Sequence, residues 1–175
     1  MKDKTNISKQ TKFIVISGII AAVYVALTYL SSFLGLAYGP IQFRISELLN
    51  ILPVFTPCAI PGLTLGCILG NIGSPMGFID IFFGSLATLL SSTSAYFLRN
   101  IKIKKFPLLS CLMPVIFNAL IIGAETTFLA NEESKGKLFL INAGQIGLSE
   151  FIMCVIGGLF LYFAILKLDI FKDSK

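Results

Sequence analysis

Hydrophobic residues in this chain gather into six runs separated by short polar segments. Four of the runs are long, at residues 13–34, 78–98, 108–129 and 138–166. At 1.5 Å per helical residue the first of these extends about 33 Å, and a bilayer's hydrocarbon core is about 30 Å thick. Each long run therefore predicts a helix that crosses a membrane.

The second and third runs are shorter and interrupted by proline. A helix over either would extend only about 22 Å. They could form two short tilted spans or one re-entrant hairpin, and because they come as a pair, both alternatives leave the sidedness of later segments unchanged. The two runs are residues 41–55 and 58–72, and the prolines are Pro40, Pro53, Pro57 and Pro61.

Composition supports an integral membrane protein. Mean hydropathy is +0.87, and 13% of residues are charged, compared with about 25% in soluble proteins. We expect an all-α, polytopic membrane helix bundle of about six helices, with one domain at residues 13–166 between tails at residues 1–12 and 167–175.

Histidine is absent, and the four cysteines stand singly in apolar segments without a C-x-x-C pair. The commonest metal ligand and the usual general base at neutral pH are therefore missing. We expect no cofactor and no metal, with the cysteines acting as small buried hydrophobic residues.

Basic residues fall mainly into three groups, which six crossings would place on one side. By the positive-inside rule that side is the cytoplasm, so both termini are expected there. The net charge of +5 then reflects membrane topology, which argues against nucleic-acid binding. The groups are Lys2, Lys4, Lys9 and Lys12; Arg99, Lys102, Lys104 and Lys105; and Lys167, Lys172 and Lys175.

Five ionisable side chains interrupt or border the apolar runs: Arg44, Glu47, Asp80, Glu125 and Glu150. A charge at the bilayer centre costs about 2.5 to over 10 kcal/mol, so such residues usually face a cavity and mark a functional site. The first four are expected near the outer surface and Glu150 near the midplane. They predict a polar ligand bound within the bilayer.

Amide side chains accompany these carboxylates. Asn118 lies seven residues before Glu125, on the same helical face, whereas Asn142, Gln145 and Ser149 form a polar arc beside Glu150. Carboxylate acceptors and amide groups together suit a flat heterocycle with several N–H groups.

Structural roles compete with ligand binding at each position. Arg44 and Glu47 are three residues apart and could form an ion pair. Asp80 could complement the dipole at a helix start, and Glu125 could belong to a wet outer rim. The amides Asn118, Asn142 and Gln145 could bond neighbouring helices together.

Small residues recur every fourth position in the first span, at Gly18, Ala22 and Ala26. Such a stripe lets another helix approach closely. It could dock a partner protein or pack within the bundle.

Four stretches resemble the QueT family: "YGPIQFRISELLNILPVFTP" (residues 38–57), "AIPGLTLGCILGN" (59–71), "DIFFGSLATLL" (80–90) and "GLSEFIMCVIGG" (147–158). These proteins are substrate-capture (S) components of energy-coupling factor (ECF) transporters associated with queuosine precursors. The resemblance implies a six-helix S component with an outward-facing pocket and no ATPase of its own, consistent with the absence of a G-x-x-x-x-G-K-[ST] loop.

The resemblance also implies partners. An S component docks onto a transmembrane coupling subunit that carries two cytoplasmic ATPases, and the family's A-x-x-x-A pattern for that contact matches Ala22 and Ala26.

A 7-deazaguanine presents N1–H and an exocyclic amine on one edge, which a single carboxylate can accept together. Our hypothesis is that Glu125 or Glu150 reads this edge, while another acid pairs with a cationic aminomethyl arm. Phe43 or Tyr38 would stack on the ring.

Two other functions remain open from the sequence. A stand-alone secondary carrier would relay protons through Asp80, Glu125 and Glu150. An intramembrane enzyme would need a carboxylate pair such as Glu125 with Glu150, and no motif supports one.

Overall fold

The computed structural model describes residues 2–37, 42–130 and 134–168, with side chains from residue 8 onward. Within these residues the chain consists of helices joined by turns and short connections, with one isolated bridge between Ile103 and Phe106 and no strand, which confirms the predicted all-α class. The elements are α1 (Lys2–Phe33), η1 (Ile45–Val54), α2 (Ala59–Gly70), η2 (Asn71–Gly73), α3 (Phe78–Leu98), α4 (Leu108–Leu129), α5 (Lys135–Glu150), η3 (Phe151–Gly157) and α6 (Gly158–Leu168).

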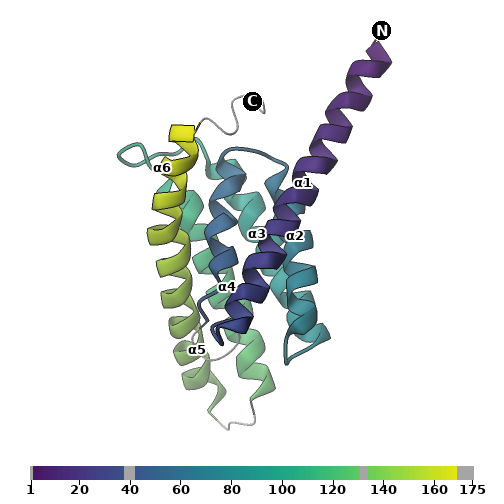
Figure 1. Ribbon diagram of the computed structural model, residues 1–175. Helices are drawn as coiled ribbons and strands as arrows, with labels where there is room; N and C mark the ends of the chain where they lie inside the picture. The colour runs from purple at the N-terminus through teal and green to yellow at the C-terminus, as the bar shows by residue number, and fades with distance from the viewer. Residues whose placement is uncertain (1, 38–41, 131–133, 169–175) are drawn as a thin grey trace.

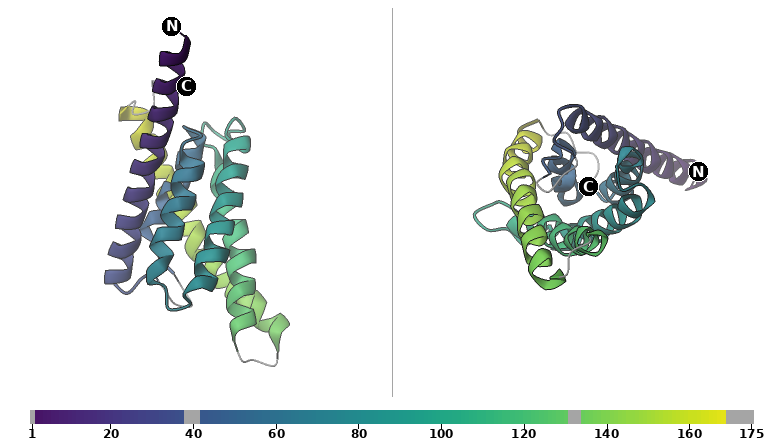
Figure 2. Two further views of the ribbon diagram at one scale, coloured as in Figure 1. Left: turned by 90° about the vertical axis from the view of Figure 1, so that its right-hand side faces the viewer. Right: turned by 90° about the horizontal axis from the view of Figure 1, so that it is seen from below.

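The helices form a ring around η1. Helices α1 to α5 are neighbours in chain order, and the 3-10 helix η1 lies inside, in contact with α1, α2, α3, α4 and α6 (Figure 2). Helix α1 begins and α6 ends at the same end of the bundle, which we call the terminal end (Figure 1). The opposite end, where α1 ends and α5 begins, is the pocket end.

Four helical stretches are long and apolar enough to cross a membrane, and they coincide with the four long predicted spans. The last is continuous, because α5 passes through the π-helix η3 into α6. The stretches are Ser8–Phe33, Phe78–Leu98, Leu108–Leu129 and Lys135–Leu168.

The proline-interrupted pair forms two short antiparallel helices, η1 and α2. The turn between them reaches the terminal end, because Phe55 and Pro57 line a cavity there with Arg99 and Leu166. This arrangement favours two short spans over a hairpin that turns back midway.

Burial is inverted relative to a soluble protein. Large hydrophobic side chains point outward, with Phe33 89% exposed and Phe128 81% exposed, whereas Arg44, Glu47 and Asp80 are each less than 10% exposed. Apolar surface of this extent is rare on soluble proteins, whereas lipid solvates it without penalty. The chain is a membrane protein.

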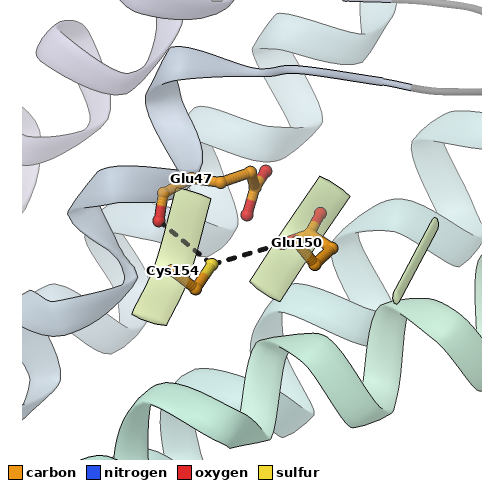
Figure 3. Close-up of side chains that lie close together, drawn as sticks. All are labelled: Glu47, Glu150 and Cys154. Atoms are coloured by element: carbon orange, nitrogen blue, oxygen red, sulfur yellow. Dashed lines mark hydrogen bonds between the residues drawn. The ribbon is translucent and has the colours of Figure 1, made fainter. Parts of the chain in front are cut away.

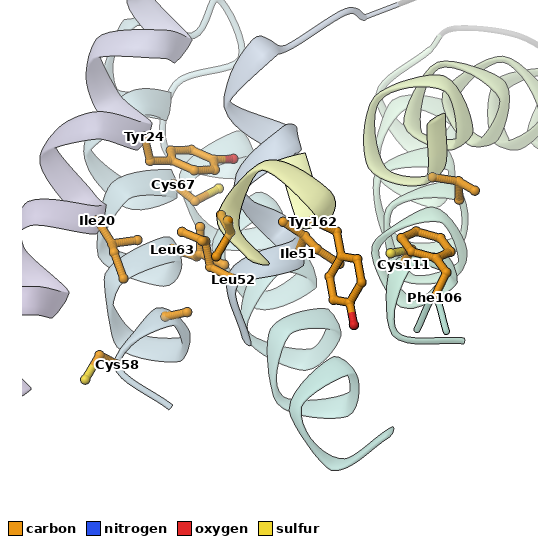
Figure 4. Close-up of a cluster of buried hydrophobic side chains, with 13 residues drawn as sticks. Ile20, Tyr24, Ile51, Leu52, Cys58, Leu63, Cys67, Phe106, Cys111 and Tyr162 are labelled. Carbon is orange, nitrogen blue, oxygen red and sulfur yellow. The ribbon is translucent and has the colours of Figure 1, made fainter. Parts of the chain in front are cut away.

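An apolar core fills the ring from its middle toward the terminal end (Figure 4). Tyr24, Ile51, Leu63, Cys111 and Tyr162 belong to it, and each is 2% exposed or less. All four cysteines are free and buried, as the sequence predicted.

Glycines on α2 allow it to approach α1 closely. A Cβ at Gly62 would lie 2.8 Å from the Ser17 carbonyl oxygen, and one at Gly66 would lie 2.7 Å from Cβ of Tyr24. Real Cβ atoms do not come this close to backbone or Cβ atoms. The α1–α2 contact therefore depends on small residues of α2.

Candidate ligand-binding site

Two adjoining cavities lie in the bundle on the side of the pocket end. The outer cavity has a volume of about 430 Å³, and the inner one about 20 Å³. Gln42, Asp80 and Ile146 line both, so the smaller cavity lies at the base of the larger. The outer volume falls in the usual range for small-molecule sites, about 300–1,000 Å³, whereas the inner one suffices for about one water molecule or the tip of a functional group.

An ion pair joins η1 to α3 beside these cavities. Nη2 of Arg44 lies 3.6 Å from Oδ2 of Asp80, and Nε of Arg44 donates to the Ala37 carbonyl at 3.1 Å. Asp80 also accepts a hydrogen bond from the Ser74 hydroxyl. Both ionised groups are buried and hydrogen-bonded, as charges removed from water must be.

Helical spacing does not place Arg44 over Glu47, although the sequence suggested an ion pair between them. Arg44 precedes η1 and has an extended backbone, with φ −84° and ψ 112°. Its side chain therefore leaves the face on which Glu47 lies. The three-residue spacing applies only within a helix.

Glu47 is held by two donors at the middle of the bundle. The hydroxyl of Tyr24, on α1, donates to Oε1 of Glu47 at 2.5 Å, and the Asn50 amide donates to Oε2. Tyr24 is fully buried. The carboxyl group is thus oriented by side chains from two helices, and it lines the inner cavity.

Glu150 faces Glu47 across the inner cavity. The thiol of Cys154 lies between them, 3.2 Å from Oε2 of Glu150 and 3.4 Å from the Glu47 carbonyl oxygen (Figure 3). The amide of Asn118 also contacts the Glu150 carboxyl. Two acids and a thiol with ligand atoms within 4.8 Å could hold a cation, either a metal ion or the ammonium of an organic ligand.

Carboxyl groups outnumber cations around the inner cavity. Arg44 is the cationic side chain among its described lining residues, and it forms its ion pair with Asp80. The charge of Arg44 also acts on Glu47 and Glu150, but the hydrogen bonds of these two acids come from neutral groups. A positively charged or proton-donating group would pair with these two acids, and that attraction would offset the cost of removing the group from water.

The structure gathers most of the predicted site residues but not all. Arg44, Glu47, Asp80, Asn118 and Glu150 line the inner cavity, and Asn142 lines the outer one. Phe43 and Gln145 are partly buried and are not among the described lining residues of either cavity. Tyr38 lies outside the described residues.

Glu125 occupies different surroundings. It is 4% exposed, and neither carboxyl oxygen has a hydrogen-bond partner. It lines an apolar groove between α3 and α4, beside Phe83 and Leu120. Seven-residue spacing does align it with Asn118, but Glu125 lies about 10 Å further along the helix.

The sequence analysis missed several residues around the cavities. Asn50 could have been predicted, because it lies three residues after Glu47 in the same helix. Tyr24 and Cys154 were not, since a single tyrosine or cysteine in an apolar span usually packs as a hydrophobic residue. The others are Gln42, Cys67, Ser74, Thr88 and Thr126.

The small residues of α1 lie on its outer surface. Gly18, Ala22 and Ala26 are exposed, and a Cβ added at Gly18 would meet no atom within 4 Å. Packing between α1 and α2 uses the opposite face, which carries Ile20 and Tyr24. The stripe is therefore not used within the bundle.

These features define a polytopic helical membrane protein with a ligand-sized cavity whose base is lined by carboxyl groups. The family model described as "QueT transporter" matches residues 14–167. The chain belongs to the QueT transporter family.

A curated relative is "Queuosine precursor transporter QueT" of Lactococcus lactis subsp. cremoris (strain MG1363), 41% identical over 81 residues. That alignment covers 46% of this chain and 47% of the relative, so it spans about half of each protein. No solved structure matches.

Proposed function

We propose that this protein is the substrate-capture component of an ATP-driven ECF importer and that it binds a queuosine precursor of the 7-deazaguanine type. The carboxyl-lined inner cavity at the base of the outer one is the observation that carries the proposal. Family membership and the name of the Lactococcus relative support the transport role and the substrate.

The sizes of the two cavities suggest how such a ligand would lie. A fused bicyclic ring fits the outer cavity, where Asp80, Gln42 and Asn142 offer acceptors and amides for its polar edge. The inner cavity is too small for a ring but accommodates an ammonium group. An aminomethyl arm would therefore reach between Glu47 and Glu150.

This arrangement revises the role expected for Glu125. Glu125 is a lining residue of the apolar α3–α4 groove and is not among the described lining residues of either cavity, so Glu150 is the stronger candidate for contact with the ligand.

The proposed partners are a transmembrane coupling subunit and two cytoplasmic ATPases. The exposed stripe of Gly18, Ala22 and Ala26 on α1 would dock the coupling subunit, because close helix approach needs small residues. The three basic groups support a cytoplasmic location for both termini. The pocket end would then open outward, where a precursor arrives.

Binding to the purified protein tests this function. Isothermal titration calorimetry with 7-aminomethyl-7-deazaguanine and with 7-cyano-7-deazaguanine compares one ring with and without a cation. We expect the wild type to bind the aminomethyl compound. Glu150→Gln should weaken that binding about 10- to 100-fold, because one charge-assisted hydrogen bond stabilises by about 1.5–3 kcal/mol.

Two comparisons make this result specific. Glu150→Gln should change affinity for the cyano compound less than about threefold, and Glu125→Gln should leave both affinities unchanged. Equal losses for both compounds would mean that Glu150 reads the ring edge rather than the arm. Failure of the wild type to bind either compound would overturn the proposed function.

A stand-alone proton-coupled carrier is the second candidate, and the facing acids Glu47 and Glu150 are what favour it. Reconstituted vesicles separate the two functions. We expect uptake to require the coupling subunit, the ATPases and ATP, and to continue when an uncoupler is added at constant ATP. Uptake by this protein alone that the uncoupler abolishes would establish the carrier instead.

A further inference from the structure

A third cavity lies at the terminal end, away from the ligand-binding site. Its volume is about 570 Å³, and it lies between the ends of η1, α3 and α6. Val54, Phe55 and Leu166 make part of the wall apolar, whereas Arg99, Asn100 and Lys102 make the other part polar and basic. None of its described lining residues is acidic.

The guanidinium of Arg99 is fixed at the edge of this cavity. Its Nη1 donates to the Tyr96 carbonyl at 2.7 Å, and its central carbon lies 3.7 Å from the centroid of the Tyr96 ring. These contacts engage one face and one N–H of the guanidinium. A guanidinium has five N–H donors in a planar fork, so others remain for an anion.

The basic connection between α3 and α4 is anchored to the cavity wall. Ile103 and Phe106 form a bridge across a tight turn, and Phe106 packs edge-on against Tyr162 with ring centroids 5.6 Å apart. Tyr162 itself lines the cavity. Figure 1 shows this connection beside the end of α6. Lys102 is thereby held near Arg99 rather than on a free loop.

Exposed apolar side chains surround the same cations. Phe97 is 73% exposed, and Ile101 and Ile103 are 49% and 50% exposed. Hydrophobic side chains and cations side by side are typical of the level where acyl chains meet headgroups. Most of the basic residues that the structure describes lie at the terminal end, among them Lys12, Arg99 and Lys167. The positive-inside rule therefore assigns this end to the cytoplasmic leaflet, where anionic lipids are concentrated.

We propose that this terminal-end cavity binds the phosphodiester headgroup of an anionic membrane lipid, with Arg99 and Lys102 as its ligands. The guanidinium fork and the lysine ammonium contact the phosphate oxygens. The apolar wall of Phe55 and Leu166 covers the glycerol and the start of the acyl chains. The site is independent of the proposed transport cargo.

Thermal unfolding of the purified full chain in uncharged detergent tests this site. Short-chain phosphatidylglycerol should raise the unfolding temperature with a saturable midpoint. Short-chain phosphatidylcholine and inorganic phosphate should not, because the former has no net charge and the latter lacks the apolar part. Equal stabilisation by both lipids, or by phosphate alone, would overturn the proposal.

Paired substitutions locate the effect. Arg99→Gln with Lys102→Gln should raise the phosphatidylglycerol midpoint about tenfold or more, since it removes two charge-assisted contacts. Lys9→Gln with Lys137→Gln removes the same charge elsewhere and should leave the midpoint unchanged. Equal shifts in the two pairs would mean diffuse attraction and would contradict a defined site. Should the first pair fail to fold, Lys102→Gln alone should still raise the midpoint, because this side chain is exposed.

Discussion

Arg44 and Asp80 meet at 3.6 Å across the interface between η1 and α3, where each is less than 10% exposed. The pair joins the central helix to the ring and borders both cavities of the ligand-binding site. Breaking a buried pair by removing one partner typically costs about 3–5 kcal/mol, because the other charge remains buried.

Arg44→Gln and Asp80→Asn should therefore each lower the unfolding temperature strongly. The double variant should lose less than the sum of the two single losses, with a coupling of about 1 kcal/mol or more, because neither charge is left alone. Thermal unfolding in detergent measures the cycle. Additive losses would mean that the two groups act independently.

Removing the Tyr24 hydroxyl should weaken ligand binding. The hydroxyl donates a buried hydrogen bond to Glu47, and Tyr24→Phe removes it. A hydrogen bond to a charged group contributes about 1.5–3 kcal/mol. We expect affinity for the aminomethyl compound to fall about tenfold or more. Tyr29→Phe is the matched control, because Tyr29 is 45% exposed and its hydroxyl makes only a 3.5 Å contact with the Leu69 carbonyl. Equal affinities in the two variants would exclude a role for the Tyr24 hydroxyl.

Substitution of two buried cysteines distinguishes a hydrogen-bonding role from a packing role. Cys154 donates to Glu150, whereas Cys111 belongs to the apolar core, and both are nearly fully buried. Cys154→Ala and Cys111→Ala should lower stability by similar amounts, about 1–2 kcal/mol. Calorimetry should detect weaker ligand binding, by about threefold to tenfold, in Cys154→Ala alone. Unchanged affinity in that variant would restrict the thiol to a packing role.

Replacing glycine by alanine should have opposite effects on stability at two positions of the α1–α2 pair. At Gly66 the added methyl group would lie 2.7 Å from Cβ of Tyr24, so Gly66→Ala should force α1 and α2 apart at a cost of about 1–3 kcal/mol. At Gly18 it meets no neighbouring atom, and alanine favours the helix by about 0.8–1.0 kcal/mol. Unfolding temperatures should fall in the first variant and hold or rise in the second. A stable Gly66→Ala would show that the α1–α2 contact tolerates separation.

Apolar length alone was sufficient to predict the four long helices, and the prolines correctly marked η1 and α2 as short. The way the helices pack side by side could not be predicted from apolar length, because the face that each helix turns inward depends on residues distant in the sequence. Arg44 illustrates the limit. Its partner lies on α3, and its extended backbone removes the helical spacing on which the comparison with Glu47 rested.

The burial of these acids was easier to predict than the direction in which each one points. Asp80 and Glu150 line the cavities, as the cost of an acid in hydrocarbon suggested, whereas Glu125 lines the α3–α4 groove. Tyr24 and Cys154 could not be predicted, because their roles come from the acids they contact rather than from any pattern of their own.

The apolar core beneath Glu47 and Glu150 also acts as an electrical insulator. Ile51 and Val155 follow the two acids by about one helical turn, and Tyr162 continues the packing toward the terminal end. A proton or small ion that reached the carboxyl groups would face a layer of hydrocarbon side chains rather than a hydrated passage. A liposome carrying this protein alone should hold a voltage as long as a bare one.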